Sequence, residues 1–195
     1  MKVNFVKTFI PVKDFVAVEK VGDKILVRFD AVKDADMDAY SCVEGSVSAS
    51  EYNEQEVRRE YEAWKQKWAE KALVLAKKAK IAEITAYDTS DKVNGFMLNG
   101  LLVWLDKATR VGLMNSTTIA KAAGQQTTTL WLGGLKLVVD CDKAIQLLSA
   151  LEMYALECFN VTASHKQAVS ELMSLEDVEV YDYKAGYPKM LEMSV

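Results

Sequence analysis

Residues 96–114 read FMLNGLLVWLDKATRVGLM, and this stretch decides the fold of the second half of the chain. Asn99-Gly100 lies between two apolar runs, and both residues tolerate the positive φ of a two-residue type I′ hairpin. Asp106 follows the second run, where its carboxylate can cap the first free amides of a helix. The stretch therefore predicts a hairpin followed by a helix over about 107–123, which Gly124 ends.

A second block of the same kind follows. Gly133-Gly134 separates the runs 127–132 and 135–139, which predicts another hairpin. Together with the helix described next, the two blocks predict a ββα-ββα domain. Its antiparallel sheet would be covered on one face by two packed helices.

The helix of the second block begins at Asp140 or Asp142, either of which can cap it. Apolar residues then recur at steps of three and four as far as Leu172, which predicts one helix of about thirty residues. Beyond it, 174–182 is expected to form a short final turn, and Gly186-Tyr187-Pro188 to end regular structure.

The first segment, residues 1–47, is predicted to be rich in β structure. Phe15–Val18 and Ile25–Phe29 are β-branched or aromatic, and Gly22-Asp23 between them forms a plausible hairpin tip. Polar and small residues at 34–40 and 45–50 are typical of a connector. The sequence therefore predicts an N-terminal β-hairpin.

A long amphipathic helix is predicted next. Ser48 and Glu51 match a capping box, and a helix from there to about Thr85 would span roughly 50 Å. Turn-forming residues at 87–92 then break the period. The predicted organisation is thus an α+β protein with a β-rich segment at 1–47, a linking helix at 48–86 and an α+β domain at 87–195. One face of the helix carries Val57, Tyr61, Trp64, Trp68, Ala72, Leu75 and Ala79.

Composition excludes several classes of protein. The net charge is -4 and no long basic stretch is present, so nucleic-acid binding is disfavoured. The apolar runs are of strand length, so no membrane span is expected. The N-terminus has scattered lysines and no apolar h-region, which predicts no secretory signal peptide and a cytoplasmic or virion location.

The cysteines and the single histidine give little support to catalysis. Cys42, Cys141 and Cys158 are odd in number and not closely paired, which favours reduced thiols. His165 lies seven residues after Cys158, on an apolar helix face. Cys141, Cys158 and His165 would offer three soft ligands for zinc, but a packed histidine is favoured, since structural zinc needs four close ligands. We expect no catalytic residue, no cofactor and no metal site.

The four tryptophans divide into two pairs. Trp104 and Trp131 lie in the two hairpins, where ordinary core aromatics are expected. Trp64 and Trp68 lie on one stripe of the long helix, where a role in binding competes evenly with a role in the core. The stripe predicts an interaction surface made of Tyr61, Trp64, Trp68 and Leu75.

Residues 81–188 carry a family resemblance in three segments: YDTSDKVNGFMLNGLLVWLDKATRVGL, LEMYALECFNVTASHKQAV and VEVYDYKAGYP. The region resembles a phage- and prophage-encoded domain of unknown function (DUF4376-like), which is commonly met beside tail-fibre and tail-assembly genes. The resemblance implies a virion or virion-assembly context. It carries over no active site.

The sequence favours a non-enzymatic structural or assembly protein, associated with a phage or prophage tail and acting through protein–protein interaction. Its partners would be further copies of itself or other tail-assembly proteins. The alternative is a small-ligand-binding or enzymatic α+β domain, with a cleft near His165 that uses Tyr154 and nearby carboxylates.

Overall fold

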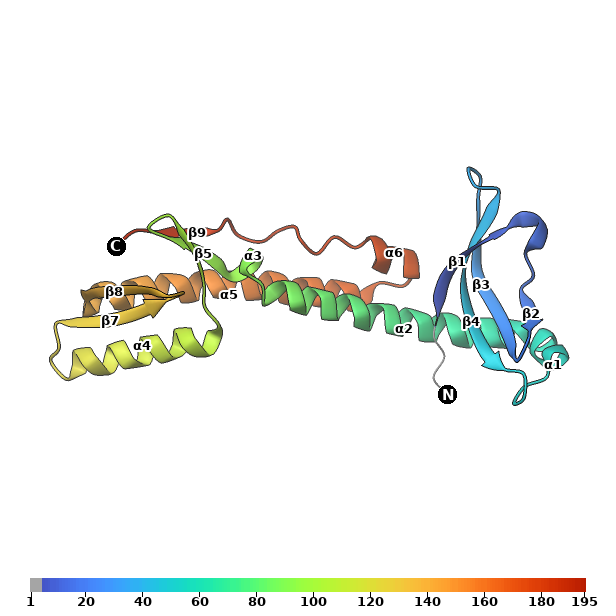
Figure 1. Ribbon diagram of the computed structural model, residues 1–195, viewed down its shortest axis with the longest axis horizontal. Coiled ribbons are helices and arrows are strands. Elements are labelled where there is room, and N and C mark those ends of the chain that lie inside the picture. The colour runs from blue at the N-terminus through green and yellow to red at the C-terminus, as the bar shows by residue number, and fades with distance from the viewer. Residues whose placement is uncertain (1–4) are drawn as a thin grey trace. The chain divides into compact units, whose positions relative to one another are not determined.

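The computed structural model describes residues 5–195, so residues 1–4 of the predicted β-rich segment lie outside the described part. The chain divides into two compact units, residues 1–76 and 77–195. Helix α2 (Tyr61–Asp88) contributes residues to both units (Figure 1). The chain combines helices with antiparallel strand pairs, so the predicted α+β class is confirmed.

A four-stranded antiparallel sheet in the order β1-β4-β3-β2 forms the first unit. The predicted hairpin at Gly22-Asp23 is present, and it joins β2 to β3. It is only half of the sheet, since β1 and β4 add two strands that the sequence pattern does not predict. The strands are β1 (Val6–Pro11), β2 (Val18–Val21), β3 (Lys24–Asp34) and β4 (Ala39–Ser48), with a short 3-10 helix η1 (Val12–Asp14) after β1.

The predicted connector is wrong over most of its length, because β4 is a central strand bonded on both sides. Its small polar residues obscure the strand pattern, yet Cys42 and Val47 are buried on the sheet. The strand predicted from Phe15 instead begins at Val18. The preceding segment is bent so that the Val16 carbonyl accepts a 2.8 Å hydrogen bond from Nη1 of Arg28.

The predicted capping box at Ser48 does not start the helix. The Ser48 hydroxyl accepts from the Ser50 amide in a turn, whereas the Asn53 side chain caps α1 (Glu54–Arg59) by accepting from the Gln55 amide at 2.9 Å. A break at Glu60 separates α1 from α2. The expected single helix is therefore two consecutive helices.

In the second unit, the local predictions hold closely. The turn at Asn99-Gly100 joins β5 to β6, with φ of 49° and 80°. Asp106 caps α4 by accepting from the Thr109 amide at 2.8 Å, and Asp140 caps α5. These elements are α3 (Asp91–Asn94), β5 (Gly95–Leu98), β6 (Leu101–Trp104), α4 (Lys107–Ala122), β7 (Thr127–Leu132), β8 (Leu135–Asp140) and α5 (Cys141–Glu171).

The arrangement of the strands differs from the predicted single antiparallel sheet. β7 and β8 form a two-stranded sheet of their own, while β6 and β5 belong to a three-stranded sheet with β9 (Leu191–Met193). β9 runs parallel to β5, so the prediction that regular structure ends at Pro188 is wrong. A three-residue strand has no periodicity of its own, and its pairing with residues 96–98 is a long-range event.

After α5 the chain returns along that helix to β9 (Figure 1). The turn predicted near residue 174 is the helix α6 (Leu175–Val180), capped by Ser174. The core of this unit joins both hairpins to the inner face of α5. Among residues 5–195, no helix is both long enough and apolar enough to cross a membrane.

Candidate functional site

The helix row predicted as an interaction surface is divided between the core and the surface. Trp68 is 2% exposed, and its ring lies 5.6 Å from that of Phe5 and 5.3 Å from that of Trp64. The approach to the sheet depends on Gly45, where an added Cβ would lie 2.5 Å from a ring carbon of Trp68. Trp68 therefore belongs to the core of the first unit and offers no free surface there.

The other members of the row have different surroundings. The Tyr61 hydroxyl donates a 2.6 Å hydrogen bond to the Arg28 carbonyl, which ties α2 to β3. Trp64 is half-buried, with its ring 5.2 Å from that of Tyr52. Only Leu75, at 43%, is an exposed large apolar side chain.

The hairpin tryptophans reverse the expectation of core aromatics. Trp104 is 38% exposed and Trp131 is 59% exposed. Trp104 lies between the buried residues Val103 and Leu105, and Trp131 lies between the buried residues Leu130 and Leu132. Because successive side chains of a strand point to opposite faces, both indoles point away from the core. The prediction that they are ordinary core residues is wrong.

His165 fastens the segment that follows α6. Its Nδ1 lies 2.9 Å from the Tyr181 hydroxyl, and its Nε2 lies 2.9 Å from the Ala185 carbonyl oxygen. Because a carbonyl only accepts, Nε2 donates to Ala185, and Nδ1 pairs with the Tyr181 hydroxyl. Both ring nitrogens thus have partners within the chain.

Tyr154, the other residue named for a cleft near His165, is also engaged in the core. Its hydroxyl donates a 2.8 Å hydrogen bond to the Val93 carbonyl, and burial raises the pKa of this phenol. The Cys158 thiol donates to the same carbonyl at 3.2 Å, and burial raises its pKa as well. A raised pKa disfavours the thiolate that nucleophilic chemistry needs.

All three cysteines are buried and unpaired by disulfides, in agreement with the predicted reduced thiols. Cys42 is a further thiol whose pKa is raised by burial. Within residues 5–195, no three histidine, cysteine, aspartate or glutamate side chains come together as a metal site would require.

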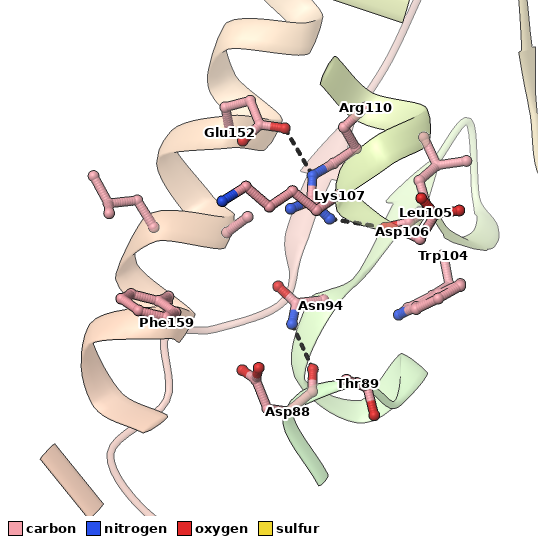
Figure 2. A pocket seen from close by; sticks show the side chains of 12 residues that line it. Asp88, Thr89, Asn94, Trp104, Leu105, Asp106, Lys107, Arg110, Glu152 and Phe159 are labelled. Atoms are coloured by element: carbon pink, nitrogen blue, oxygen red, sulfur yellow. Dashed lines mark hydrogen bonds and ion pairs between the residues drawn. The ribbon is translucent and has the colours of Figure 1, made fainter. Parts of the chain in front are cut away.

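A cleft of about 390 Å³ lies in the second unit, and neither His165 nor Tyr154 is among the residues that line it. It is bounded by the end of α2, the junction of β6 with α4, and one side of α5 (Figure 2). Trp104 and Phe159 stand on opposite walls in Figure 2, and Phe159 is 60% exposed. The lining side chains are Asp88, Thr89, Asn94, Trp104, Leu105, Asp106, Lys107, Arg110, Glu152, Ala155, Leu156 and Phe159.

One end of the cleft is built on the first turn of α4. Lys107 and Arg110 are three residues apart, so they lie on the same side of the helix. Arg110 is only 8% exposed; its Nε donates to Glu152 and its Nη1 to the Leu105 carbonyl, each at 2.8 Å. This pair links α4 to α5 and compensates a buried charge that would otherwise be costly.

The opposite end is formed by the last turn of α2 and by α3. Asp88 accepts a 2.8 Å hydrogen bond from the Thr162 hydroxyl on α5. The Asn94 side-chain amide donates to the Asp88 carbonyl at 2.6 Å and satisfies one of the open carbonyls of the helix end. Figure 2 shows Asp88 and Asn94 on the side of the cleft opposite Lys107 and Arg110.

The family model described as "Domain of unknown function (DUF4376)" matches residues 75–185. The chain belongs to this family. No curated protein and no solved structure matches the chain. The segment matching DUF4376 begins inside α2 and ends after α6, so it contains every residue that lines the cleft.

Most of this DUF4376 cleft was not predicted from the sequence. The partners Arg110 and Glu152 are far apart in the chain, and no spacing rule connects them. The exposed positions of Leu156 and Phe159 on α5 are also hard to predict, because the strong apolar period of the buried side dominates the sequence pattern of this helix. One usable signal was the alternation around Trp104, since two apolar neighbours facing the core place the tryptophan on the other face.

Proposed function

We propose that this DUF4376 protein is a non-enzymatic structural or assembly component that acts through protein–protein contacts. We further propose that it is associated with a phage or prophage tail, in the bacterial cytoplasm or in the virion. The tail context is supported by the resemblance of residues 81–188 to phage-encoded domains. The mode of action is supported by the surface of the second unit.

The single observation that carries the proposal is the group of exposed apolar side chains around the cleft. Met153, Leu156 and Phe159 are exposed on α5, and Trp104 is exposed across from them. Met153, Leu156 and Phe159 lie on one face of α5, because residues three apart on a helix are neighbours. Exposed apolar patches mark interaction sites, and aromatic side chains are enriched among the residues that dominate binding.

The partner would be a second copy of the chain or another protein of the same assembly. Leu75 remains exposed on α2 and is available for such contacts in the first unit. Trp68 is not, because its own sheet covers it. The proposed surface is thus the cleft of the second unit, with the helix row reduced to a minor contribution.

A specific observation also favours small-ligand binding as a second candidate. The cleft volume of about 390 Å³ falls within the range of ligand pockets, which is roughly 300–1,000 Å³. Its walls are apolar and its two ends are polar, as ligand sites commonly are. Because the cleft does not include His165, this candidate no longer uses the histidine.

Light scattering coupled to size-exclusion chromatography tests the proposal. We expect the wild-type protein to self-associate, or to form a complex with a protein encoded beside it. Replacing Leu156 and Phe159 together by serine should weaken that association at least about tenfold, since central apolar anchors dominate interfaces. Ile119→Ser is the matched control, because Ile119 is an exposed apolar residue of α4 outside the cleft lining.

A strictly monomeric wild-type protein that binds no neighbouring gene product would contradict the proposal. Equal loss of association in the Ile119→Ser control would also contradict it, because the effect would not be specific to the cleft. Native mass spectrometry that finds a small molecule bound to the monomer, and absent from the double variant, would favour the second candidate.

A further inference from the structure

The cationic end of the cleft has binding capacity that the fold leaves unused. Nε and Nη1 of Arg110 are occupied by Glu152 and the Leu105 carbonyl. Its third nitrogen, Nη2, makes no hydrogen bond with residues 5–195. Lys107 likewise forms no ion pair with the described part of the chain. Donors on a buried guanidinium bind carboxylates through charge-assisted hydrogen bonds.

The carboxylates near this end are already committed. Glu152 is paired with Arg110, and Asp106 accepts hydrogen bonds from the amide and hydroxyl of Thr109 at 2.8 and 2.7 Å. Asp106 therefore balances the positive end of α4. Lys107 and Arg110 are therefore matched in number by Asp106 and Glu152, and what this end of the cleft retains is two sets of cationic donors, the Lys107 ammonium and Nη2 of Arg110, that no carboxylate of the described chain engages.

The opposite end has acceptors. Asp88 uses Oδ1 for the Thr162 hydroxyl, and Asn94 donates its side-chain amide to a backbone carbonyl. Asp88 and Asn94 both line the cleft, and each side chain carries oxygen atoms that can accept hydrogen bonds. They suit the main-chain N–H groups of an extended segment.

We infer that the cleft binds an acidic side chain of a partner polypeptide, held next to an apolar side chain of the same segment. The carboxylate contacts Lys107 and Nη2 of Arg110. The apolar neighbour lies between Trp104 and Phe159, and the backbone of the segment donates to Asp88 or Asn94. This inference rests on the proposed function, and it names the chemistry of the partner.

Two capped peptides that differ only in charge test the inference. Acetyl-Gly-Phe-Glu-Gly-amide and its glutamine analogue are titrated into the full-length ¹⁵N-labelled protein, and the amide shifts are followed by NMR. The glutamate peptide should bind with a dissociation constant on the order of 1 mM, as expected for a short flexible ligand. It should bind about three- to tenfold more tightly than the glutamine peptide, with shifts at the cleft.

Lys107→Gln should reduce the difference between the two peptides at least about twofold, because it removes one of the two cations that contact the carboxylate without disturbing the Arg110–Glu152 pair. Lys107 is exposed, so this variant is expected to fold. Lys143→Gln is the matched control, since Lys143 is an exposed lysine of α5 that does not line the cleft. It should preserve the preference for glutamate, and added salt should reduce that preference in the wild type.

Equal affinity of the wild-type protein for the two peptides, or no binding of either at millimolar concentration, would overturn the inference. If the two peptides fail this test but the Leu156 and Phe159 double variant still loses protein association, the proposed function stands and only the carboxylate inference is overturned. Conversely, the protein could prefer the glutamate peptide and yet remain a monomer that binds no other protein. The carboxylate-binding site would then be supported, but its assignment to a partner polypeptide would be wrong. The proposed function would then fail separately.

Discussion

Two pairs of tryptophans, one in each unit, have opposite surroundings. On α2, Trp68 is packed against a four-stranded sheet, and Trp64 is half-buried beside it. In the hairpins, Trp104 and Trp131 point away from the core. The helix pair resembled an exposed binding stripe, whereas the hairpin pair resembled a core. A periodic pattern therefore identifies which residues share a face, but not whether another element packs against that face.

The physical cause lies in the neighbouring elements. The helix stripe is covered because β4 provides a glycine that lets the indole reach the backbone of the sheet. Each hairpin has only two faces, and the aliphatic residues on one face already fill the core beneath it. A tryptophan on the alternate position then has nothing above it.

The largest test of this contrast is to remove the indoles one at a time. Trp68→Ala should destabilise the first unit by about 3–5 kcal/mol, because it empties a closely packed site. Trp131→Ala should cost less than about 1 kcal/mol, since the side chain is mostly in solvent. Urea unfolding followed by circular dichroism measures both. Similar losses in the two variants would show that the contrast in burial has no energetic meaning.

A smaller effect is expected from Gly45, which controls the approach of Trp68. Gly45→Ala should destabilise the first unit by about 1–3 kcal/mol, because the new methyl group overlaps the ring. Gly112→Ala is the control: this glycine lies inside α4 with open space around it, so alanine should stabilise by about 0.5–1 kcal/mol. The two changes should move the urea midpoint in opposite directions. A stabilising Gly45→Ala would mean that the ring does not rest on the strand.

The smallest effect concerns the cap that follows Trp104. Hydrogen bonds from the Thr109 amide and hydroxyl hold the pKa of Asp106 below its ordinary value of 3.8. A depressed pKa means that the cap stabilises the fold above pH 3.8 and that this contribution is lost as the pH falls through the lower, folded-state value. Asp106→Asn keeps an acceptor but does not titrate. Its thermal midpoint should therefore fall less steeply than that of the wild type on acidification, and parallel curves would refute the assignment.

The parts of the fold that could be predicted are those set by local chemistry. Asn99, Asp106 and Gly124 each act within a few residues, so the turn, the cap and the helix end were visible in the sequence. The length of α5 followed from its period. In contrast, β4 was missed because Ser41, Gly45 and Ser46 interrupt the apolar pattern by which a strand is recognised.

The candidate site was harder to predict for the same reason. The cleft joins Asp88, Arg110 and Phe159, which come from three separate elements. Their proximity depends on how α4 and α5 pack, and that packing is not encoded in any one window of sequence. The Arg110–Glu152 pair is visible only after folding. The sequence around Lys107 and Arg110 predicts a helix, but it does not indicate that these residues line a cleft.

Strand β9 has a consequence for synthesis on the ribosome. Residues 96–98 form their hairpin with the strand that follows directly, but their other edge is completed only by residues 191–193. A nascent chain therefore exposes that edge of β5 while almost all of the intervening unit is translated, since long-range parallel pairing cannot begin earlier. Slow translation or a stall in this interval would lengthen the time in which β5 can pair with a wrong strand.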